Sequence, residues 1–326
     1  ALDFAAGFSA MREYKKRETP RIRFSNAAKL FADGAIFSAL MQMDFPGYVD
    51  GHHGEWLMSP EVLAQGVEAC WNEGLQIHCH VNGDAGMASV IAALEAAQAS
   101  RPRFDHRFTV HHVGFHTNAQ SRKLGALGAH ASVNPYYIHA LSDVFSEGAL
   151  GPERGQQLVR CGSLLRNGLS VSFHSDFLMA PIEPLLLAWC AATRTTRSGK
   201  QVSPAECLTL QQALRGITID AAFAIKMDHE IGSLAAGKLA DFTVLEDDPF
   251  ELGVERLKEA RVAGVVFEGA WRPLAKPTAS VFASSALPAA YPDGGSTHAC
   301  CEADGDPCTF IRKIGEMAAS HIRNAA

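Results

Sequence analysis

Short apolar runs alternate with amphipathic segments along most of the chain, and this pattern predicts strands and helices in turn. The runs that we expect to form strands are 21–31, 75–80, 107–112, 129–134 and 169–173. The segments that we expect to form helices are 59–72, 85–99, 118–127, 152–166, 184–193 and 210–226. Apolar strands that alternate with helices indicate an α/β fold in which helices cover a parallel sheet.

The pattern changes after Met227. Residues 230–249 and 261–273 contain short strand-like runs separated by turns with glycine, which predicts a small β-module. The segment 276–326 is rich in Pro, Ala, Ser and Gly and is expected to be a loosely held tail with a short helix at 310–323. We therefore divide the chain into an N-terminal segment (1–20), an α/β domain (21–227), a β-portion (228–275) and a C-terminal tail (276–326).

Composition narrows the class of protein. The chain has 326 residues, of which 47% are hydrophobic and 20% charged, and its formal net charge is −6. Such a chain has enough apolar material for a large core, and its net negative charge gives no reason to expect nucleic acid as a partner. No apolar run reaches the roughly 18 residues of a membrane span, so we expect no membrane partner. The N-terminus has no signal-peptide pattern and no initiating Met, so the natural start can lie upstream.

The cysteines favour a reducing compartment. Five of the eight cysteines lie singly in expected strands, helices or their flanks, where they serve as small buried apolar residues. A metal or disulfide role for the tail cysteines Cys300, Cys301 and Cys308 stays open, although no pair has zinc-ribbon spacing. The prediction is a cytoplasmic protein.

The stretch 74–86 is the most informative part of the sequence. In the strand 75–80, His78 and His80 share one face, because alternate side chains of a strand point to opposite sides. Residues 82–84 (Asn-Gly-Asp) then turn the chain into a helix. A strand that ends in metal-competent side chains and leads into a helix is typical of the catalytic face of a parallel α/β enzyme.

Three other strands also end in polar groups. Together with His80, these groups are Lys29, His112 and Asp176. Alternation predicts that His112 shares a face with Val110 and that His111 points to the opposite face. It also predicts that Asp176 shares a face with His174. Since the carboxyl ends of parallel strands meet at one edge, Lys29, His80, His112 and Asp176 are expected to converge there.

Such a set has a chemical purpose if it converges. Two neutral imidazoles and a carboxylate suit a divalent metal, most often zinc, which lowers the pKa of bound water to about 7. A carboxylate beside that water can act as general base and then protonate a leaving amine. For each residue taken alone, a structural histidine or an ion-paired lysine is the competing interpretation.

The motifs resemble a known family. They are 29–34 (KLFADG), 80–84 (HVNGD), 110–112 (VHH) and 173–176 (FHSD), followed by 213–222 and 230–245. In this order they resemble the amidohydrolase superfamily and, within it, the YtcJ-like group that includes the N-substituted formamide deformylases. The resemblance covers roughly residues 20–275, and the stretch 230–245 is its most specific part.

The resemblance implies a fold and a metal site. The fold would be a partial (β/α)8 TIM-type barrel, strands four to eight, with a small C-terminal β-sandwich portion. Lys29, as a carbamate, would bridge metals at the end of strand four, and His80 and His112 would be ligands on strands five and six. Asp176 would orient and deprotonate the hydrolytic water. The site would hold one or two ions, with zinc as the expected metal.

The sequence also departs from the family. A His-x-His pair and three strands should precede Lys29, but only 28 residues do. The chain is therefore expected to be the C-terminal part of a longer enzyme, a gene fragment, or a chain that needs a missing N-terminal half or a homo-oligomer, since open sheet edges are a liability in water. His111 stands where the family often has Glu, and His174 where it often has Gly.

These observations predict a metal-dependent hydrolase of an amide- or formamide-type C–N bond in a small-molecule substrate, with Asp176 as general base. The irregular segment 35–58 and the loop after the fourth strand supply further candidates for substrate contact. These candidates are His52, His53, Tyr136, Tyr137 and His174, with ordinary loop residues as the alternative for them. Two rival functions remain: a non-catalytic remnant that acts as a binding or regulatory protein, and a different metal enzyme that uses His78 and His80 as its first ligand pair.

Overall fold

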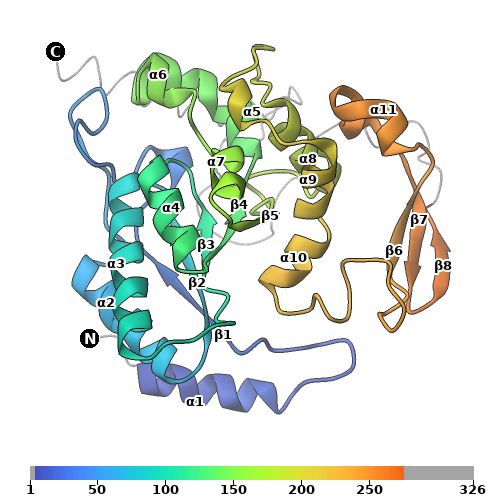
Figure 1. Ribbon diagram of the computed structural model, residues 1–326, viewed down its shortest axis with the longest axis horizontal. Helices are drawn as coiled ribbons and strands as arrows, with labels where there is room; N and C mark the ends of the chain where they lie inside the picture. The colour runs from blue at the N-terminus through green and yellow to red at the C-terminus, as the bar shows by residue number, and fades with distance from the viewer. Residues whose placement is uncertain (1–3, 275–326) are drawn as a thin grey trace, which may run out of the picture.

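A computed structural model describes residues 4–274, and its centre is a parallel sheet of five strands (Figure 1). The strands lie in sequence order: β1 (Ala27–Phe31), β2 (Gln76–Val81), β3 (Thr109–His112), β4 (His130–Val133) and β5 (Ser170–Phe173). Every neighbouring pair is parallel. Each link between strands is therefore a crossover that contains helices. The predicted α/β fold, a partial barrel of five strands, is confirmed.

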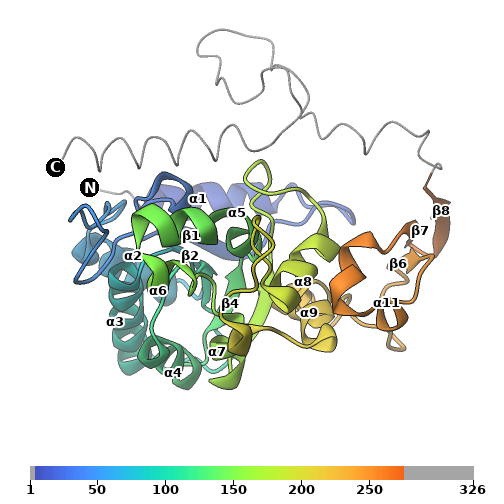
Figure 2. The same cartoon turned by 90° about the horizontal axis from the view of Figure 1, so that it is seen from above.

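Helices flank this sheet, and side-chain caps begin several of them. They are α1 (Phe4–Lys15), α2 (Pro60–Asn72), α3 (Asp84–Ser100), α4 (Asn118–Ala126), α5 (Tyr136–Val144), α6 (Pro152–Gly155), α7 (Cys161–Arg166), α8 (Pro184–Thr193), α9 (Leu210–Gly216), α10 (Ile219–Ala224) and α11 (Pro249–Arg256). The Ser59 side chain accepts a hydrogen bond from the Val62 N–H and Pro60 opens α2, whereas Thr117 opens α4 through a capping box. Figure 2 shows α3, α4 and α7 along one side of the sheet.

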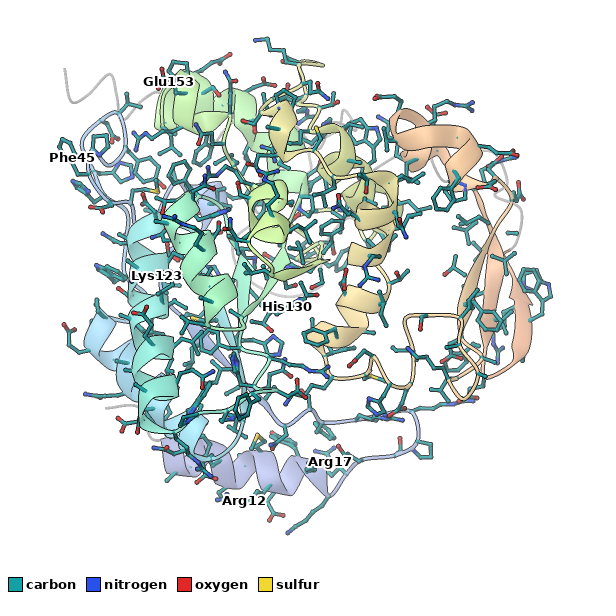
Figure 3. All side chains as sticks on the ribbon, in the orientation of Figure 1. Arg12, Arg17, Phe45, Lys123, His130 and Glu153 are labelled. Carbon is teal, nitrogen blue, oxygen red and sulfur yellow. The ribbon has the colours of Figure 1, made fainter. Side chains whose placement is uncertain are left out.

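The two faces of the sheet differ in chemistry. One row across the strands consists of apolar residues, all of them buried: Leu30, Cys79, Val110, Ala131 and Val171. Helix α2 packs on this face, where Leu30 approaches Gly66. The next row, on the opposite face, consists of Phe31, His80, His111, Ser132 and Ser172. His130 also lies on this polar face, near the centre of the molecule (Figure 3).

Three predicted segments differ from the structure. The stretch after β4, expected to be a loop, forms α5 and a turn of π-helix, Phe145–Ala149. The helix expected at 152–166 is divided into α6 and α7, because Val159 has a left-handed φ of 47° between them. The helix expected at 210–226 is divided at Thr218, whose φ of −128° and ψ of −101° are not helical. Single residues with unusual backbone angles leave hydrophobic periodicity intact, so the pattern does not reveal them.

A second, antiparallel sheet follows the parallel one, at the right of Figure 1. Its strands are β6 (Phe242–Leu245), β7 (Val262–Phe267) and β8 (Ala270–Pro273). The sequence predicted these strands but not α11, a short helix that Asp248 caps through the Phe250 N–H. The division of the chain at 227 and 275 stays a prediction. The predicted helix at 310–323 and the tail cysteines lie outside the described residues.

Between residues 4 and 274, none of the helices has both the length and the apolar character that a membrane crossing requires.

Candidate functional site

The structure brings the four strand-end residues to one edge of the parallel sheet. The imidazole rings of His80 and His112 lie 4.5 Å apart between their centroids. The Asp176 Oδ2 lies 4.0 Å from the His112 Nδ1. Lys29 joins this group through His111, whose Nδ1 lies 2.5 Å from the Lys29 Nζ. The expected convergence of Lys29, His80, His112 and Asp176 is therefore present in the geometry.

These residues belong to a larger imidazole cluster, which we define as His78, His80, His111, His112 and His174. The His111 Nε2 lies 2.8 Å from the His78 Nδ1, so His111 contacts both Lys29 of β1 and His78 of β2. The His174 Nε2 lies 3.0 Å from the His112 Nδ1, and the His174 Nδ1 lies 3.0 Å from the Ser132 Oγ. The cluster thus contains two hydrogen-bonded pairs of rings, His78 with His111 and His112 with His174, and His80 packs against His112 through a ring contact.

The prediction that His111 points away from this site was wrong. The strand register places His111 beside His80 and His112 beside Val81. With simple alternation, the His111 side chain would therefore lie on the polar face and the His112 side chain on the apolar face. His112 nevertheless joins the cluster because its φ is +70°, a left-handed conformation that turns its side chain at the strand end. The adjacent pair of histidines was the signal that could have identified His111.

Burial keeps the imidazoles neutral at physiological pH. Burial, together with the nearby Lys29 ammonium, lowers the pKa of His78 and of His80 to about 4 and that of His174 to about 3. It also holds the pKa of His112 well below the ordinary value. Neutral imidazole is the form that binds a metal.

The pKa values of Lys29 and Asp176 are shifted in directions that are common among catalytic groups. Much of the Lys29 side chain is exposed, but its Nζ packs among the imidazoles, and this desolvation lowers the pKa of Lys29 to about 8. Burial raises the pKa of Asp176, while the nearby Lys29 ammonium acts in the opposite direction. A lysine with a depressed pKa beside a carboxylate with a raised one is typical of a functional site.

The two tyrosines predicted to contact substrate lie on α5 instead of a loop. The Tyr137 hydroxyl is 3.3 Å from the His112 Nδ1, so Tyr137 is part of the site. The ring of Tyr136 packs 5.8 Å from that of His139. The structure therefore places Tyr137 in contact with the site, and substrate contact by Tyr136 stays a prediction.

The two loop histidines contact their own loop. The His52 imidazole bonds to the Asp50 carboxylate and the Ala39 carbonyl, and it stacks on the Tyr48 ring at 4.0 Å. The His53 Nδ1 lies 3.0 Å from the Met43 carbonyl oxygen. These contacts explain how the segment 35–58 keeps its shape, and substrate contact by either ring stays a prediction.

A buried carboxylate fixes that loop to the site. Asp33, which is 0% exposed, accepts hydrogen bonds from the backbone N–H groups of Gln42, Asn82 and Gly83 at 2.9, 2.8 and 2.7 Å. We call this arrangement the Asp33 clasp. Gly83 is required there because a Cβ would lie 2.1 Å from the Gln42 carbonyl oxygen. The clasp joins the end of β1, the end of β2 and the loop, whose far tip carries Phe45 (Figure 3).

The donor chemistry of the site fits a divalent metal. Lys29, His80, His112 and Asp176 offer an amine that can form a carbamate, two neutral imidazoles and a carboxylate. Within residues 4–274, however, no three His, Cys, Asp or Glu side chains are yet arranged to hold an ion together. The His80 Nε2 accepts a hydrogen bond from the Asn82 side chain at 3.1 Å. The residues fit a divalent metal by their donor chemistry.

Comparison with known proteins gives the family. The model of the amidohydrolase family matches residues 3–271. The chain belongs to the amidohydrolase family. This confirms the resemblance predicted from the motifs at 29–34, 80–84, 110–112 and 173–176.

Individual relatives of this amidohydrolase family member include two from bacteria and one from a plant. The N-substituted formamide deformylase of Arthrobacter pascens is 27% identical over 246 residues, which are 76% of this chain and 45% of that protein. The Bacillus subtilis (strain 168) amidohydrolase YtcJ is 24% identical over 79% of this chain and 48% of its own length. The protein LONG AFTER FAR-RED 3 of Arabidopsis thaliana is 30% identical over 70% of this chain and 40% of its own length.

A solved structure agrees on the fold. An uncharacterized metal-dependent hydrolase from Pyrococcus horikoshii OT3 superposes with a TM-score of 0.64 at 21% identity, covering 76% of this chain and 50% of that one. The chain spans less than half the length of the curated relatives that it matches. Its part of the amidohydrolase fold carries Lys29, His80, His112 and Asp176 on one edge.

Proposed function

We propose that this chain is the C-terminal, acid–base part of a metal-dependent hydrolase that cleaves an amide- or formamide-type C–N bond in a small molecule. The observation that carries the proposal is the approach of His80, His112 and Asp176 at the carboxyl ends of three strands of a parallel sheet. Membership of the amidohydrolase family supports the hydrolase class, and the similarity to an N-substituted formamide deformylase supports the bond type.

Each residue has a separate part in this chemistry. Lys29 (as a carbamate), His80 and His112 would hold one or two divalent ions, with zinc as the expected metal, and such an ion supplies a Lewis acid and an acidified water. Asp176 accepts a proton from the attacking water and then delivers it to the departing nitrogen. Its raised pKa suits the first step, because the conjugate base of a weaker acid accepts a proton more readily.

Tyr137 and His174 orient this machinery. Both contact the same nitrogen of His112, so they fix the tilt of the ring that faces Asp176. His174 and Tyr137 are also the best placed of the predicted substrate contacts. The second imidazole pair, His78 and His111, holds Lys29 at the opposite side of the cluster.

The experiment that tests the proposal combines metal content with product release. The purified chain is expected to contain about one equivalent of zinc after incubation with Zn²⁺ and removal of excess. Addition of a separately expressed N-terminal half from a longer relative should then permit release of formate from N-substituted formamides. A chain that binds no divalent metal, alone or with that half, would contradict the proposal.

The alternative function is a non-catalytic binding protein. The observation that favours it is the lack of any assembled three-donor group in the described part of the chain. This alternative predicts that the purified chain retains no zinc, while it still binds small amides beside the imidazole cluster. The use of His78 and His80 as a first ligand pair is less favoured, because the His78 Nδ1 contacts His111 and the His80 Nε2 contacts Asn82.

The proposed setting is the cytoplasm, and the proposed partner is a complementary barrel half or a second copy. Five cysteines of the described chain are free thiols: Cys70, Cys79, Cys161, Cys190 and Cys207. Free thiols are expected where the compartment is reducing. The open strands β1 and β5 at the two ends of the sheet order are where a complementary half would pair.

A further inference from the structure

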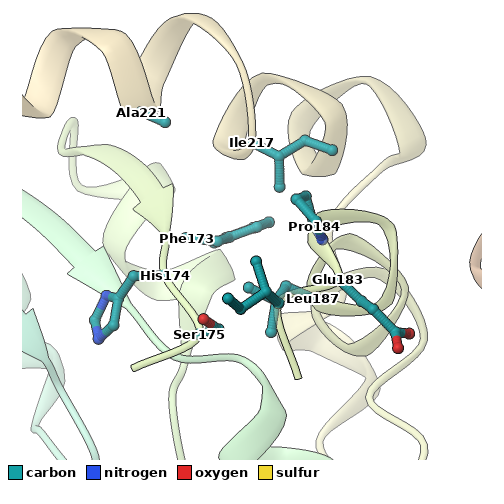
Figure 4. A pocket seen from close by; sticks show the side chains of 9 residues that line it. Phe173, His174, Ser175, Glu183, Pro184, Leu187, Ile217 and Ala221 are labelled. Carbon is teal, nitrogen blue, oxygen red and sulfur yellow. The ribbon is translucent and has the colours of Figure 1, made fainter. Parts of the chain in front are cut away.

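Two places outside the imidazole cluster have features of a ligand site. The first is a cavity of about 120 Å³ beside β5 (Figure 4). Its lining includes Phe173, Leu187 and Ile217, and the His174 ring points away from it, so it offers mainly apolar contacts. The second lies where the loop after β3 meets the start of α7 and the end of α8. It consists of buried charged and polar side chains and is therefore the better candidate for binding a polar ligand.

The centre of this second place is His116, in the loop between β3 and α4. His116 is 0% exposed, and among residues 4–274 neither of its ring nitrogens has a hydrogen-bond partner. The Arg160 guanidinium lies beside it, because its Nη2 donates a hydrogen bond of 2.5 Å to the His116 carbonyl oxygen. The Arg160 Nε–H is also buried and, within the same range, has no acceptor. Buried polar groups nearly always have a partner, so these neighbouring donors indicate a bound polar ligand.

Arg194, at the end of α8, brings a buried positive charge to the same place. It is 0% exposed. Its guanidinium donates hydrogen bonds to four backbone carbonyl oxygens, those of Gln156, Leu158, Val159 and Val202. Carbonyl oxygens satisfy the N–H groups but carry no full negative charge. Because a buried charge is costly unless an opposite charge compensates it, this arrangement favours a nearby anion.

The neighbouring carboxylate, that of Glu206, is already used by other donors. Its Oε1 accepts hydrogen bonds from the Ser163 hydroxyl and the Arg166 guanidinium, and its Oε2 accepts one from the Ser163 N–H. Burial, together with the two neighbouring arginine charges, lowers the pKa of His116 to about 3, so its ring is neutral and has one N–H to donate. The positive potential at the ring favours an anion over a water molecule.

We propose that His116 and Arg160 bind one small monovalent anion, chloride, and that Arg194 supplies the second compensating positive charge. The anion accepts hydrogen bonds from the His116 ring N–H and from the Arg160 Nε–H. It thereby gives these buried donors a partner and neutralises one of the two arginine charges. The site is separate from Lys29 and Asp176, and it does not depend on the proposed hydrolytic chemistry.

The position of this anion gives it a structural consequence. It joins the loop after β3 to the segment that precedes α7, and the same two segments are connected by a hydrogen bond of 2.9 Å from the Val159 N–H to the Gly114 carbonyl oxygen. Gly114 lies two residues after His112, whose left-handed φ turns its side chain into the candidate site. Anion binding is therefore expected to stabilise the loop that leaves this site.

Thermal unfolding in matched salts tests the proposal. The unaltered chain is compared in sodium chloride and in sodium gluconate of the same ionic strength, because gluconate is too large for an enclosed site. The midpoint should be higher in chloride by about 3 °C, the shift expected for an ion at about tenfold its Kd. His116→Phe keeps an aromatic ring without an N–H, and Arg160→Gln removes the charge and the Nε donor. Each should abolish the shift, whereas His229→Asn, an exposed histidine paired with Glu230, should retain it.

Each outcome decides for or against the anion site. A chloride-dependent shift that both variants abolish supports it, and a bromide ion beside His116 in bromide-soaked crystals would locate it. Equal midpoints of the unaltered chain in the two salts overturn the proposal in favour of a bound water molecule. A shift that persists in either folded variant also overturns it, because the ion would then bind elsewhere. If His116→Phe does not fold, Arg160→Gln decides, since Arg160 is only partly buried.

Discussion

Two aspartates at the ends of strands in the same sheet have opposite uses. Asp33, two residues after β1, is completely buried and accepts three backbone N–H groups in the Asp33 clasp. Asp176, three residues after β5, has a side chain that is 46% exposed and faces the His112 Nδ1. Burial raises the pKa of both carboxyl groups, so the shift alone does not distinguish them.

The difference lies in what the oxygens contact. The Asp33 oxygens hold three segments of backbone in place, and this requires the carboxylate to stay where it is. The Asp176 oxygen lies beside titratable side chains at an open edge, where a proton can be taken up and released. Hydrogen-bond partners, more than residue type or pKa, therefore separate a structural carboxylate from one that is available for chemistry.

The largest expected effect comes from Asp176→Asn. The amide cannot accept a proton from water, so turnover by the complemented enzyme should fall by about 10²- to 10⁴-fold. Stability should be nearly unchanged because the side chain is half exposed. Steady-state kinetics and thermal unfolding measure the two quantities. A variant that loses stability but keeps its turnover would reverse the roles that we assign to the two aspartates.

The next largest effect is expected for Asp33→Ala. Removal of the carboxylate leaves three buried N–H groups without their acceptor, and this should lower the free energy of unfolding by about 3 kcal/mol or more. Asp33→Asn retains one oxygen and should cost about 1–2 kcal/mol. Urea denaturation of both variants measures these values. Nearly unaltered stability in Asp33→Ala would show that the clasp does not hold the loop.

The pH dependence of stability should sharpen the same comparison. Burial raises the pKa of Asp33 to about 7, so between pH 4 and 7 the folded chain binds a proton that the unfolded chain has lost. The contribution of Asp33 to stability is therefore fully present below the unfolded pKa and should fall, by up to about 1.4 kcal/mol per pH unit, as the pH rises toward 7. The buried histidines, whose pKa values are lowered, contribute with the opposite sign. The test is therefore the difference in the free energy of unfolding between the unaltered chain and Asp33→Asn at several pH values. This difference should shrink as the pH rises from 4 to 7, and a constant difference would contradict the assignment to Asp33.

Sequence reasoning recovered the fold because the pattern that specifies it is repeated. Each strand contributes one buried apolar residue to the row from Leu30 to Val171. The caps at Ser59 and Thr117 are local sequence signals for the starts of helices. Helix α11 was missed because its eight residues offer too few turns for a period. The broken helices at Val159 and Thr218 were missed because a single backbone angle leaves no trace in composition.

The candidate site was recovered less completely, for a physical reason. Strand ends identified Lys29, His80 and Asp176, but the orientation of His112 depends on a left-handed φ that alternation cannot anticipate. The bond between His111 and Lys29 and the bond between His174 and His112 join distant parts of the chain, so they follow from the packing of the strands. The Asp33 clasp could not be predicted from the sequence either, because it also joins segments that are distant along the chain. Its Gly83 nevertheless lies in the motif 80–84 that indicated the site.

The smallest effect is expected for His52→Asn. This variant tests whether His52 has a structural role, as Asp33 has, or a role in the chemistry of the site, as Asp176 has. The His52 ring bonds to Asp50 and the Ala39 carbonyl and stacks on Tyr48, all within the loop that the clasp secures. Its loss should lower the free energy of unfolding by about 1 kcal/mol, because one partly exposed hydrogen-bonded ring is removed. Zn²⁺ affinity and turnover should stay unchanged, whereas His112→Asn should abolish both. A His52→Asn variant with normal stability but an altered KM would instead place His52 in contact with the substrate. The segment 35–58 would then contribute to substrate binding as well as to stability.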